Sequence, residues 1–199
     1  MKKTILTIAI ALSAVLGISK TGFAATGSSE DATTLTEVSQ ISKIEIHGNV
    51  QVYLSNGTAD QVKVYNHYYS ESALVQDQDG LLRITSYSAK KLVVWVTVSD
   101  LHKLSVYDNA VVKSFGKLSA IDLDVKLYNT ALVQLNLDSY SANVGLHDGA
   151  KADLTGNITT GRFAYDQSSF LNTAELTVTG TVKKVRYTVR NFSSDLASL

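Results

Sequence analysis

Cysteine and proline are both absent from the 199 residues. Without cysteine the chain has no disulfide framework, no thiolate metal site, no cysteine nucleophile and no cysteine to carry a lipid anchor. Without proline it lacks the residue that most often interrupts a strand. Valine, threonine, tyrosine and isoleucine, which favour strands, are plentiful. These features together predict an all-β protein.

The chain also lacks an excess of charge of either sign. Its 18 basic and 18 acidic residues give a formal net charge of zero. Without residues 1–24 the balance is 15 basic against 18 acidic residues, a net charge of −3. No basic cluster remains in that part of the chain, so nucleic acid is excluded as a partner.

Residues 1–24 have the pattern of a secretory signal peptide. Lys2 and Lys3 form the charged start, residues 5–18 form the apolar stretch, and small residues precede a cut before Ala25. The apolar stretch is shorter than the roughly 20 residues that span a membrane. We therefore expect an exported protein with no membrane span in the mature chain, located in the periplasm or at the cell surface of a Gram-negative bacterium.

After the signal, residues 25–40 are rich in Ser, Thr, Gly and acids and predict a flexible lead-in. Residues 41–199 predict one folded domain. Two interpretations of residues 41–98 stay open: they share the fold of the rest, or they form a less regular N-terminal part that caps it. Apolar and polar residues alternate there, and Asn56-Gly57 and Asp79-Gly80 are tight-turn signals. Residues 92–98 are apolar on both faces, which predicts a strand covered on both sides or a junction within the fold.

One short pattern recurs in the second half of the chain. Each copy is a large polar or aromatic residue, then Asp or Asn, a variable residue and a small one. The copies are Tyr107-Asp108-Asn109-Ala110, Tyr128-Asn129-Thr130-Ala131, His147-Asp148-Gly149-Ala150, Tyr165-Asp166-Gln167-Ser168 and Arg190-Asn191-Phe192-Ser193. The regular spacing of the Asp/Asn positions predicts a parallel β-solenoid, a right-handed β-helix with coils of about 20 residues.

The second and fourth positions of this pattern have structural explanations. Asp and Asn tolerate the left-handed backbone conformation and can accept a hydrogen bond from their own backbone two residues on. The small residue lets the chain turn back into the core. We therefore interpret each copy as a corner between strands.

The first position of each corner is predicted to face outward, so these residues should form a strip on one surface. The strip residues are Tyr107, Tyr128, His147, Tyr165 and Arg190, with Tyr65 and His47 as extensions. Two interpretations remain open. The strip binds a glycan or a protein through its rings, or it is a cross-strand ladder that stabilises the sheet.

Residues that carry catalysis or bind metals are not gathered into recognisable motifs. Asp108, Asp148 and Asp166 could form a calcium column, but asparagines interrupt it and it supplies few charged ligands. The four histidines share no metal-ligand spacing. The compact acid-base set is Asp122, Asp124 and Lys126, and we predict no enzyme, no metal site and no cofactor.

Several segments resemble the putative auto-transporter adhesin, head GIN domain family. The resemblance rests on the signal peptide, the opening at residues 44–52, the segments 79–84 and 101–106, and the corners followed by Ala or Ser. It covers about residues 41–199. The family implies a right-handed β-helix without known catalytic residues, with a role in adhesion. The corners here carry Asp or Asn where the family typically has glycine.

The sequence therefore predicts an exported, non-enzymatic surface or envelope module that binds a glycan or a protein. A carbohydrate-acting β-helix enzyme is one alternative. A structural envelope protein that associates with copies of itself is another, because open strand ends pair readily with neighbours.

Overall fold

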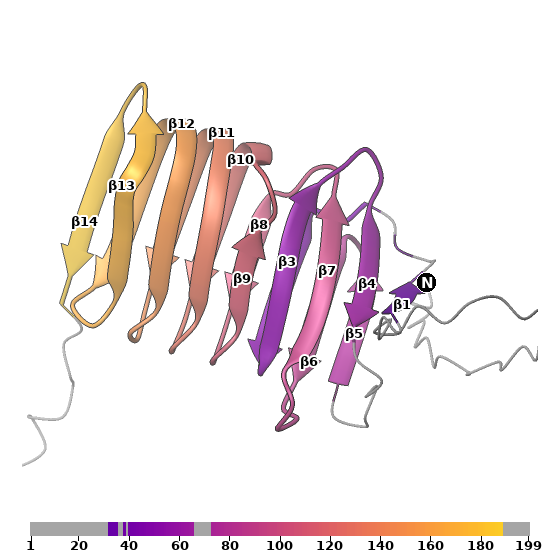
Figure 1. The fold of residues 1–199 in the computed structure, drawn as a ribbon. Coiled ribbons are helices and arrows are strands. Elements are labelled where there is room, and N and C mark those ends of the chain that lie inside the picture. The colour runs from indigo at the N-terminus through magenta and orange to yellow at the C-terminus, as the bar shows by residue number, and fades with distance from the viewer. Residues whose placement is uncertain (1–31, 36–37, 39, 66–72, 189–199) are drawn as a thin grey trace, which may run out of the picture.

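The computed structural model describes residues 32–35, 38, 40–65 and 73–188, which form fourteen strands joined by turns (Figure 1). The bounds in chain order are β1 Ala32–Leu35, β2 Lys43–Gly48, β3 Val50–Asn56, β4 Gln61–Tyr65, β5 Ala73–Gln78, β6 Leu81–Ser86, β7 Leu92–Val98, β8 Lys103–Val106, β9 Val111–Ser114, β10 Leu118–Leu127, β11 Leu132–Leu146, β12 Lys151–Asp166, β13 Phe170–Val178 and β14 Val182–Tyr187. The predicted signal peptide and the predicted corner at 190–193 lie outside the described residues. β1 falls within the predicted lead-in.

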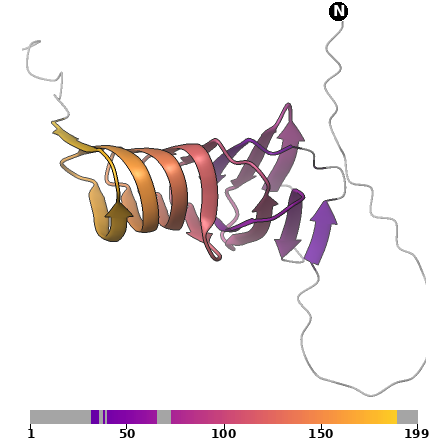
Figure 2. The ribbon, with the colours of Figure 1, turned by 90° about the horizontal axis from the view of Figure 1, so that it is seen from above.

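The all-β prediction is confirmed, but the predicted right-handed parallel β-helix is wrong. The strands form one curled mixed sheet, a half-barrel (Figure 2). Three pairs are antiparallel: β1 with β4, β4 with β7, and β5 with β6. The physical reason is visible at Asp79-Gly80. This two-residue turn pairs Gln78 with Leu81 and reverses the chain at once, so β5 and β6 form a hairpin.

The N-terminal part of the chain belongs to the same sheet as the rest. Among the described residues, every antiparallel pair lies within residues 32–98. β2 pairs in parallel with β8, and β3 pairs in parallel with β9. The two halves of the chain are thus joined by continuous backbone hydrogen bonding.

In the second half of the chain, parallel partners are separated by nearly the same number of residues, which matches the repeat spacing of the sequence. Leu118 pairs with Leu137, and Leu132 pairs with both Lys151 and Val111. β11 pairs with β9 near its start and with β10 over its second half, so this long strand bends round the core (Figure 2). The corners of successive strands therefore lie side by side at the same end of the strands.

The core lies on the inner face of the curled sheet and consists almost entirely of aliphatic side chains. Burial alternates along the strands, as in β7, because successive side chains point to opposite faces. Phe163 is the largest fully buried side chain. Asp166 is the only charged side chain that is buried among the described residues, with 1% exposed. The opposite face of each strand carries the side chains available for contact with other molecules.

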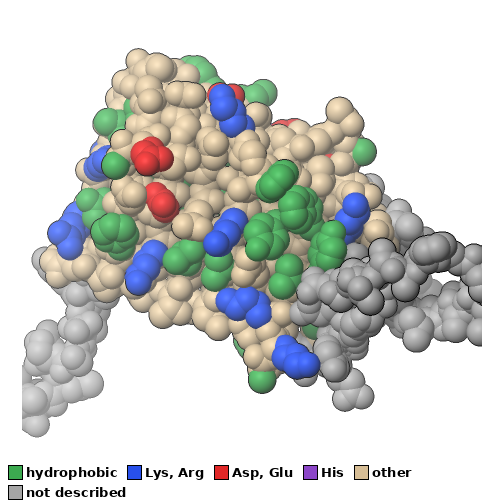
Figure 3. Space-filling model, in the orientation of Figure 1, with side chains coloured by type: hydrophobic (Ala, Val, Ile, Leu, Met, Phe, Trp, Pro, Cys, Tyr) green, Lys and Arg blue, Asp and Glu red, His purple; other side chains and the backbone are tan. Residues whose placement is uncertain are grey.

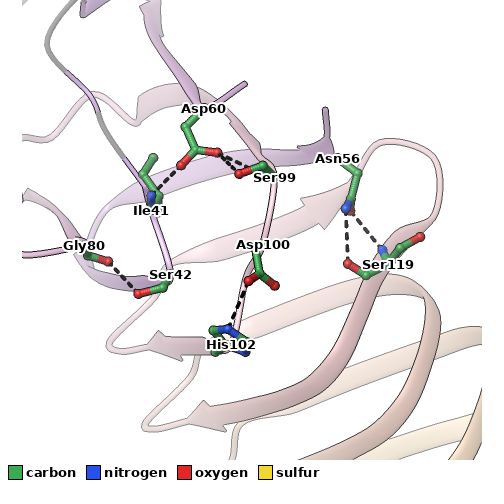
Figure 4. Close-up of polar contacts among 9 residues, drawn as sticks. All are labelled: Ile41, Ser42, Asn56, Asp60, Gly80, Ser99, Asp100, His102 and Ser119. Atoms are coloured by element: carbon green, nitrogen blue, oxygen red, sulfur yellow. Dashed lines mark hydrogen bonds and ion pairs between the residues drawn. The ribbon is translucent and has the colours of Figure 1, made fainter. Parts of the chain in front are cut away.

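Polar side chains fasten the loops at one end of the sheet (Figure 4). The Asp60 carboxylate accepts hydrogen bonds from the Ile41 N–H and from both the N–H and the hydroxyl of Ser99, the last two at 2.7 and 2.8 Å. Asn56 bonds the backbone of Ser119 twice, as donor at 3.1 Å and as acceptor at 2.9 Å. These contacts join segments that lie far apart in the chain.

Candidate functional site

Five aromatic and imidazole rings form a line across neighbouring strands, at the ends where the corners lie. We call this line the ring row; its members are His47, Tyr107, Tyr128, His147 and Tyr187. The first four are stacked, with centroid distances of 4.3, 4.8 and 4.8 Å and interplanar angles of 3°, 3° and 9°. Tyr187 follows at 5.7 Å, tilted by 49°. The strands bring the rings together because equivalent positions pair side by side.

Three corners next to this row have the predicted backbone. Asp108, Asn129 and Asp148 adopt φ of 60°, 60° and 61°. In each corner the N–H of the small residue donates to the carbonyl of the ring residue three positions earlier, at 3.2 or 3.3 Å. The small residues, Ala110, Ala131 and Ala150, are fully buried. The corner prediction is confirmed at these three positions.

The predicted fourth corner is out of register by one residue. Asp166 pairs with Tyr187 and belongs to strand β12, and it is not among the described residues with positive φ. Ser169, rather than Ser168, takes the buried place of the small residue. Asp166 therefore occupies the position that His147 holds in the preceding corner, and Tyr187 supplies the next ring instead.

The Asp166 carboxylate is fully engaged inside the protein. It accepts hydrogen bonds from the N–H of Asp148, from the N–H and hydroxyl of Ser168, and from the N–H of Ser169. Burial disfavours the charged form, but the hydrogen bonds from Ser169, Ser168 and Asp148 outweigh it and lower the pKa of Asp166 to about 2. The bond to Ser168, two residues on, is the predicted local Asp turn.

The structure brings together only part of the predicted strip. Tyr107, Tyr128 and His147 lie in the ring row. Tyr165 is half-buried against the core, and Arg190 lies outside the described residues. Within the row the ring faces cover one another, which leaves the ring edges for solvent. This geometry favours the stabilising ladder, since stacking on a sugar requires a free ring face.

Charged groups adjoin the row at its His47 end. Glu45 accepts a hydrogen bond from Arg83 at 3.1 Å and contacts His47 at 2.9 Å. Partial burial of Glu45 opposes its ionisation, but His47 and Arg83 stabilise the carboxylate and lower its pKa. Burial and the neighbouring Tyr128 raise the pKa of Tyr107. Burial, Asp166 and Asp148 likewise raise the pKa of Tyr187 at the other end of the row, so charged groups adjoin the row at both ends.

A second group of rings lies on the outer face of β3 and β7 and at the residue that follows β9. We call it the aromatic face; it consists of Tyr53, Trp95 and Phe115. Trp95 stacks on Tyr53 at 5.4 Å and meets Phe115 at 5.0 Å and 60°. Phe115 is 65% exposed. Figure 3 shows hydrophobic side chains gathered on this side of the molecule, with basic side chains around them.

Polar neighbours fix two rings of the aromatic face. Gln51 donates to the Tyr53 hydroxyl at 2.6 Å, and the Trp95 indole N–H donates to Ser55 at 3.3 Å. These three rings were not predicted from the sequence as a group. Their signal was the run at residues 92–98, apolar on both faces, whose outer side the structure leaves half-exposed. Tyr53 and Trp95 cover part of each other, so Phe115 is the most exposed ring of the three. Rings held in place in this way can pack against a ligand at little cost in side-chain entropy.

The acidic candidates do not converge. Asp108 accepts from Gly48 and Asn129, and Asp124 accepts from Asn143 and lies 3.7 Å from Lys126. Within the residues described, no group of three or more His, Cys, Asp or Glu side chains is placed to hold a metal ion. Nor does any helix in that part of the chain have the length and apolar character to cross a membrane.

The profile of the putative auto-transporter adhesin, head GIN domain family matches residues 40–187. The chain belongs to this family, and membership supports a general role in binding or adhesion at an exported or surface location. No functionally curated protein matches the chain.

Solved structures share the fold. A putative adhesin from Parabacteroides merdae is 13% identical with a TM-score of 0.64, over 79% of this chain and 78% of the other. A putative adhesin from Bacteroides fragilis is 16% identical with a TM-score of 0.64, over 80% of each chain. A putative lipid binding protein from Parabacteroides distasonis is 9% identical with a TM-score of 0.62, over 77% of this chain and 78% of the other. At these identities the likeness concerns the fold alone.

Proposed function

We propose that this chain is an exported, non-enzymatic binding module that attaches to a glycan or a protein through its aromatic face. The observation that carries the proposal is the cluster of Trp95, Tyr53 and Phe115, whose rings are held in place while part of their surface stays open. Aromatic side chains of this kind supply most of the contact energy in binding surfaces. Membership of an adhesin family supports the same role.

The ring row is the other candidate surface. It contains three residues of the predicted strip, Tyr107, Tyr128 and His147. Its rings face one another at 4.3 to 4.8 Å, so its exposed edges are limited to polar contacts. We assign it a stabilising role and assign attachment to the aromatic face.

Attachment of the full chain to a glycan array and to immobilised matrix proteins tests this division of roles. One variant carries Trp95→Ala with Phe115→Ala, and the other carries Tyr107→Ser with Tyr128→Ser. We expect the first variant to lose attachment and keep its circular dichroism spectrum. We expect the second to lose stability and keep attachment wherever it remains folded.

Attachment unchanged in a folded Trp95→Ala, Phe115→Ala variant would remove the aromatic face from the proposal. Loss of attachment in a folded Tyr107→Ser, Tyr128→Ser variant would move the binding surface to the ring row. Turnover of a bound polysaccharide would favour a carbohydrate-acting enzyme instead.

A further inference from the structure

We propose that the ligand of the aromatic face is an anionic polysaccharide that lies across strands β4, β7, β3 and β9. This inference rests on the proposed function, since it names the ligand class of the same surface. It follows from one row of paired positions, in which a lysine stands at each end of two aromatic rings. We call this row the Lys63–Lys113 track; its members are Lys63, Trp95, Tyr53 and Lys113.

The backbone register sets the order of the track. Lys63 pairs with Trp95 across β4 and β7, Trp95 pairs with Tyr53 across β7 and β3, and Tyr53 pairs with Lys113 across β3 and β9. Paired residues point to the same face of a sheet. Adjacent strands are about 4.8 Å apart, so the two lysine positions are separated by three strand spacings, or about 14 Å. A linear ligand that crosses the strands meets a cation, two rings and a second cation in turn.

The outer face of these four strands is positively charged, although the whole chain is neutral. The outward residues described there are Gln61, Lys63, Tyr65, Val93, Trp95, Thr97, Gln51, Tyr53, Ser55, Val111 and Lys113, among which no acid occurs. The nearby Asp60 carboxylate is already engaged by Ile41 and Ser99. A ligand that carries carboxylate or sulfate groups is therefore favoured over a neutral one.

The two residue types supply different parts of the recognition. Trp95 and Tyr53 stack on each other and offer the exposed parts of their rings to the C–H groups of a sugar. Each lysine ammonium is a point charge with three donors on a flexible stem, which can follow an acidic group along a polymer. Gln51, next to Tyr53 on the same strand face, adds a polar side chain beside the track.

A lipid surface fits this face less well than a polysaccharide. Proteins that lie on a membrane bury an apolar face about 5–10 Å into it. Tyr53 and Trp95 are only half-exposed and lie in the outer surface of the sheet, and Phe115 is the one ring of the aromatic face that is largely exposed. A flat surface of this kind matches an extended chain laid on it.

Trp95 is the only tryptophan of the chain, so its fluorescence reports on the track directly. The full chain is titrated with polygalacturonate and, separately, with dextran as a neutral polysaccharide. We expect polygalacturonate to change the emission, dextran to leave it unchanged, and the affinity to fall as salt is raised. Replacing both Lys63 and Lys113 by Ser should weaken binding about tenfold, because two surface ion pairs are lost. Lys183→Ser, an exposed lysine in β14, is the matched control and should bind like the wild type.

Three results would overturn the inference. If dextran binds as well as polygalacturonate and the double lysine variant is unaffected, the ligand is a neutral glycan and the proposed binding function stands. If phosphatidylglycerol vesicles change the Trp95 emission and polygalacturonate does not, the surface binds lipid. If matrix proteins on the array bind through Trp95 while neither polysaccharide does, the ligand is a protein and only the anionic-glycan inference falls.

Discussion

The Tyr187 hydroxyl lies 2.6 Å from Nδ1 of His147 and donates to the Leu146 carbonyl at 2.9 Å. The two rings come from strands that do not pair directly, because β12 lies between β11 and β14. Tyr187 therefore reaches back over Asp166, whose short side chain leaves room in the ring row. This contact connects the last described strand to the three corners before it.

Tyr187→Phe should destabilise the protein by about 1 kcal/mol. It removes the part-buried hydrogen bond to the Leu146 carbonyl and leaves Nδ1 of His147 without its partner. Urea denaturation followed by circular dichroism measures the change. Tyr140→Phe is the matched control, because Tyr140 is 62% exposed, and its stability should equal that of the wild type. Equal stability of the two variants would show that the end of the row carries no such bond.

Asp166→Asn should make stability less dependent on acid pH. The folded pKa of Asp166, about 2, lies below its ordinary value of 3.8, so its ionised form stabilises the fold above pH 4. That contribution, about 2 kcal/mol, is lost as the pH falls through the folded pKa. Denaturation at several pH values should give curves that differ at pH 7 and converge near pH 2. Asp138→Asn is the control, because Asp138 is exposed and lies 3.7 Å from Lys117. Its stability should follow that of the wild type at every pH.

Gly48→Ala should destabilise the protein severely, by about 3 kcal/mol, because φ is +81° and a Cβ there would lie 2.1 Å from the Ser86 carbonyl oxygen. Gly116→Ala separates the two causes. Gly116 has a similar φ of +77° but open space around the added Cβ, so only the backbone cost of about 1 kcal/mol applies. Thermal melts of the two variants test the difference. Equal losses would mean that the close approach of Gly48 to β6 is easily relieved.

Asn143→Asp should be destabilising in a salt-dependent way. The Asn143 amide donates to Asp124 at 2.7 Å, and a carboxylate in its place would set two like charges opposite each other. We expect a loss of about 0.5–1 kcal/mol at low salt that shrinks as ionic strength rises. Asn143→Ser, which loses the bond without adding charge, should show no such salt dependence. A salt-independent loss for both variants would assign the effect to the hydrogen bond alone.

Local rules in the sequence proved more informative than the overall period. Asp108, Asn129 and Asp148 adopt the left-handed turn that their side chains predict. The hairpin at Asp79-Gly80 was visible as a turn, but pairing partners far apart in the chain, such as β4 and β7, leave no local mark. The fourth corner was placed one residue early because Tyr165-Asp166 resembles Tyr107-Asp108. Only the register of β12 with β14 shows that Asp166 holds the place of a ring.

The two groups of rings differed in how far the sequence could predict them. The ring row was largely predictable, since one outward position per corner repeats at the same edge. The aromatic face was not, because Tyr53, Trp95 and Phe115 lie far apart in the chain, on strands whose adjacency depends on the whole sheet.

The pairing offsets of the parallel strands also bear on the order in which the chain folds. In the second half, each parallel strand pairs with a strand close to it in the chain, as Leu118 does with Leu137. In contrast, β2 must find β8, and β3 must find β9, across a much longer stretch of chain. Closing a loop about three times as long costs about 1 kcal/mol more in chain entropy.

The strands from β10 onward can therefore nucleate by short-range pairing, while the pairing of β2 with β8 and of β3 with β9 follows later. The segment that is synthesised first is completed late, and the aromatic face, built from β3, β7 and β9, forms only when both halves have joined.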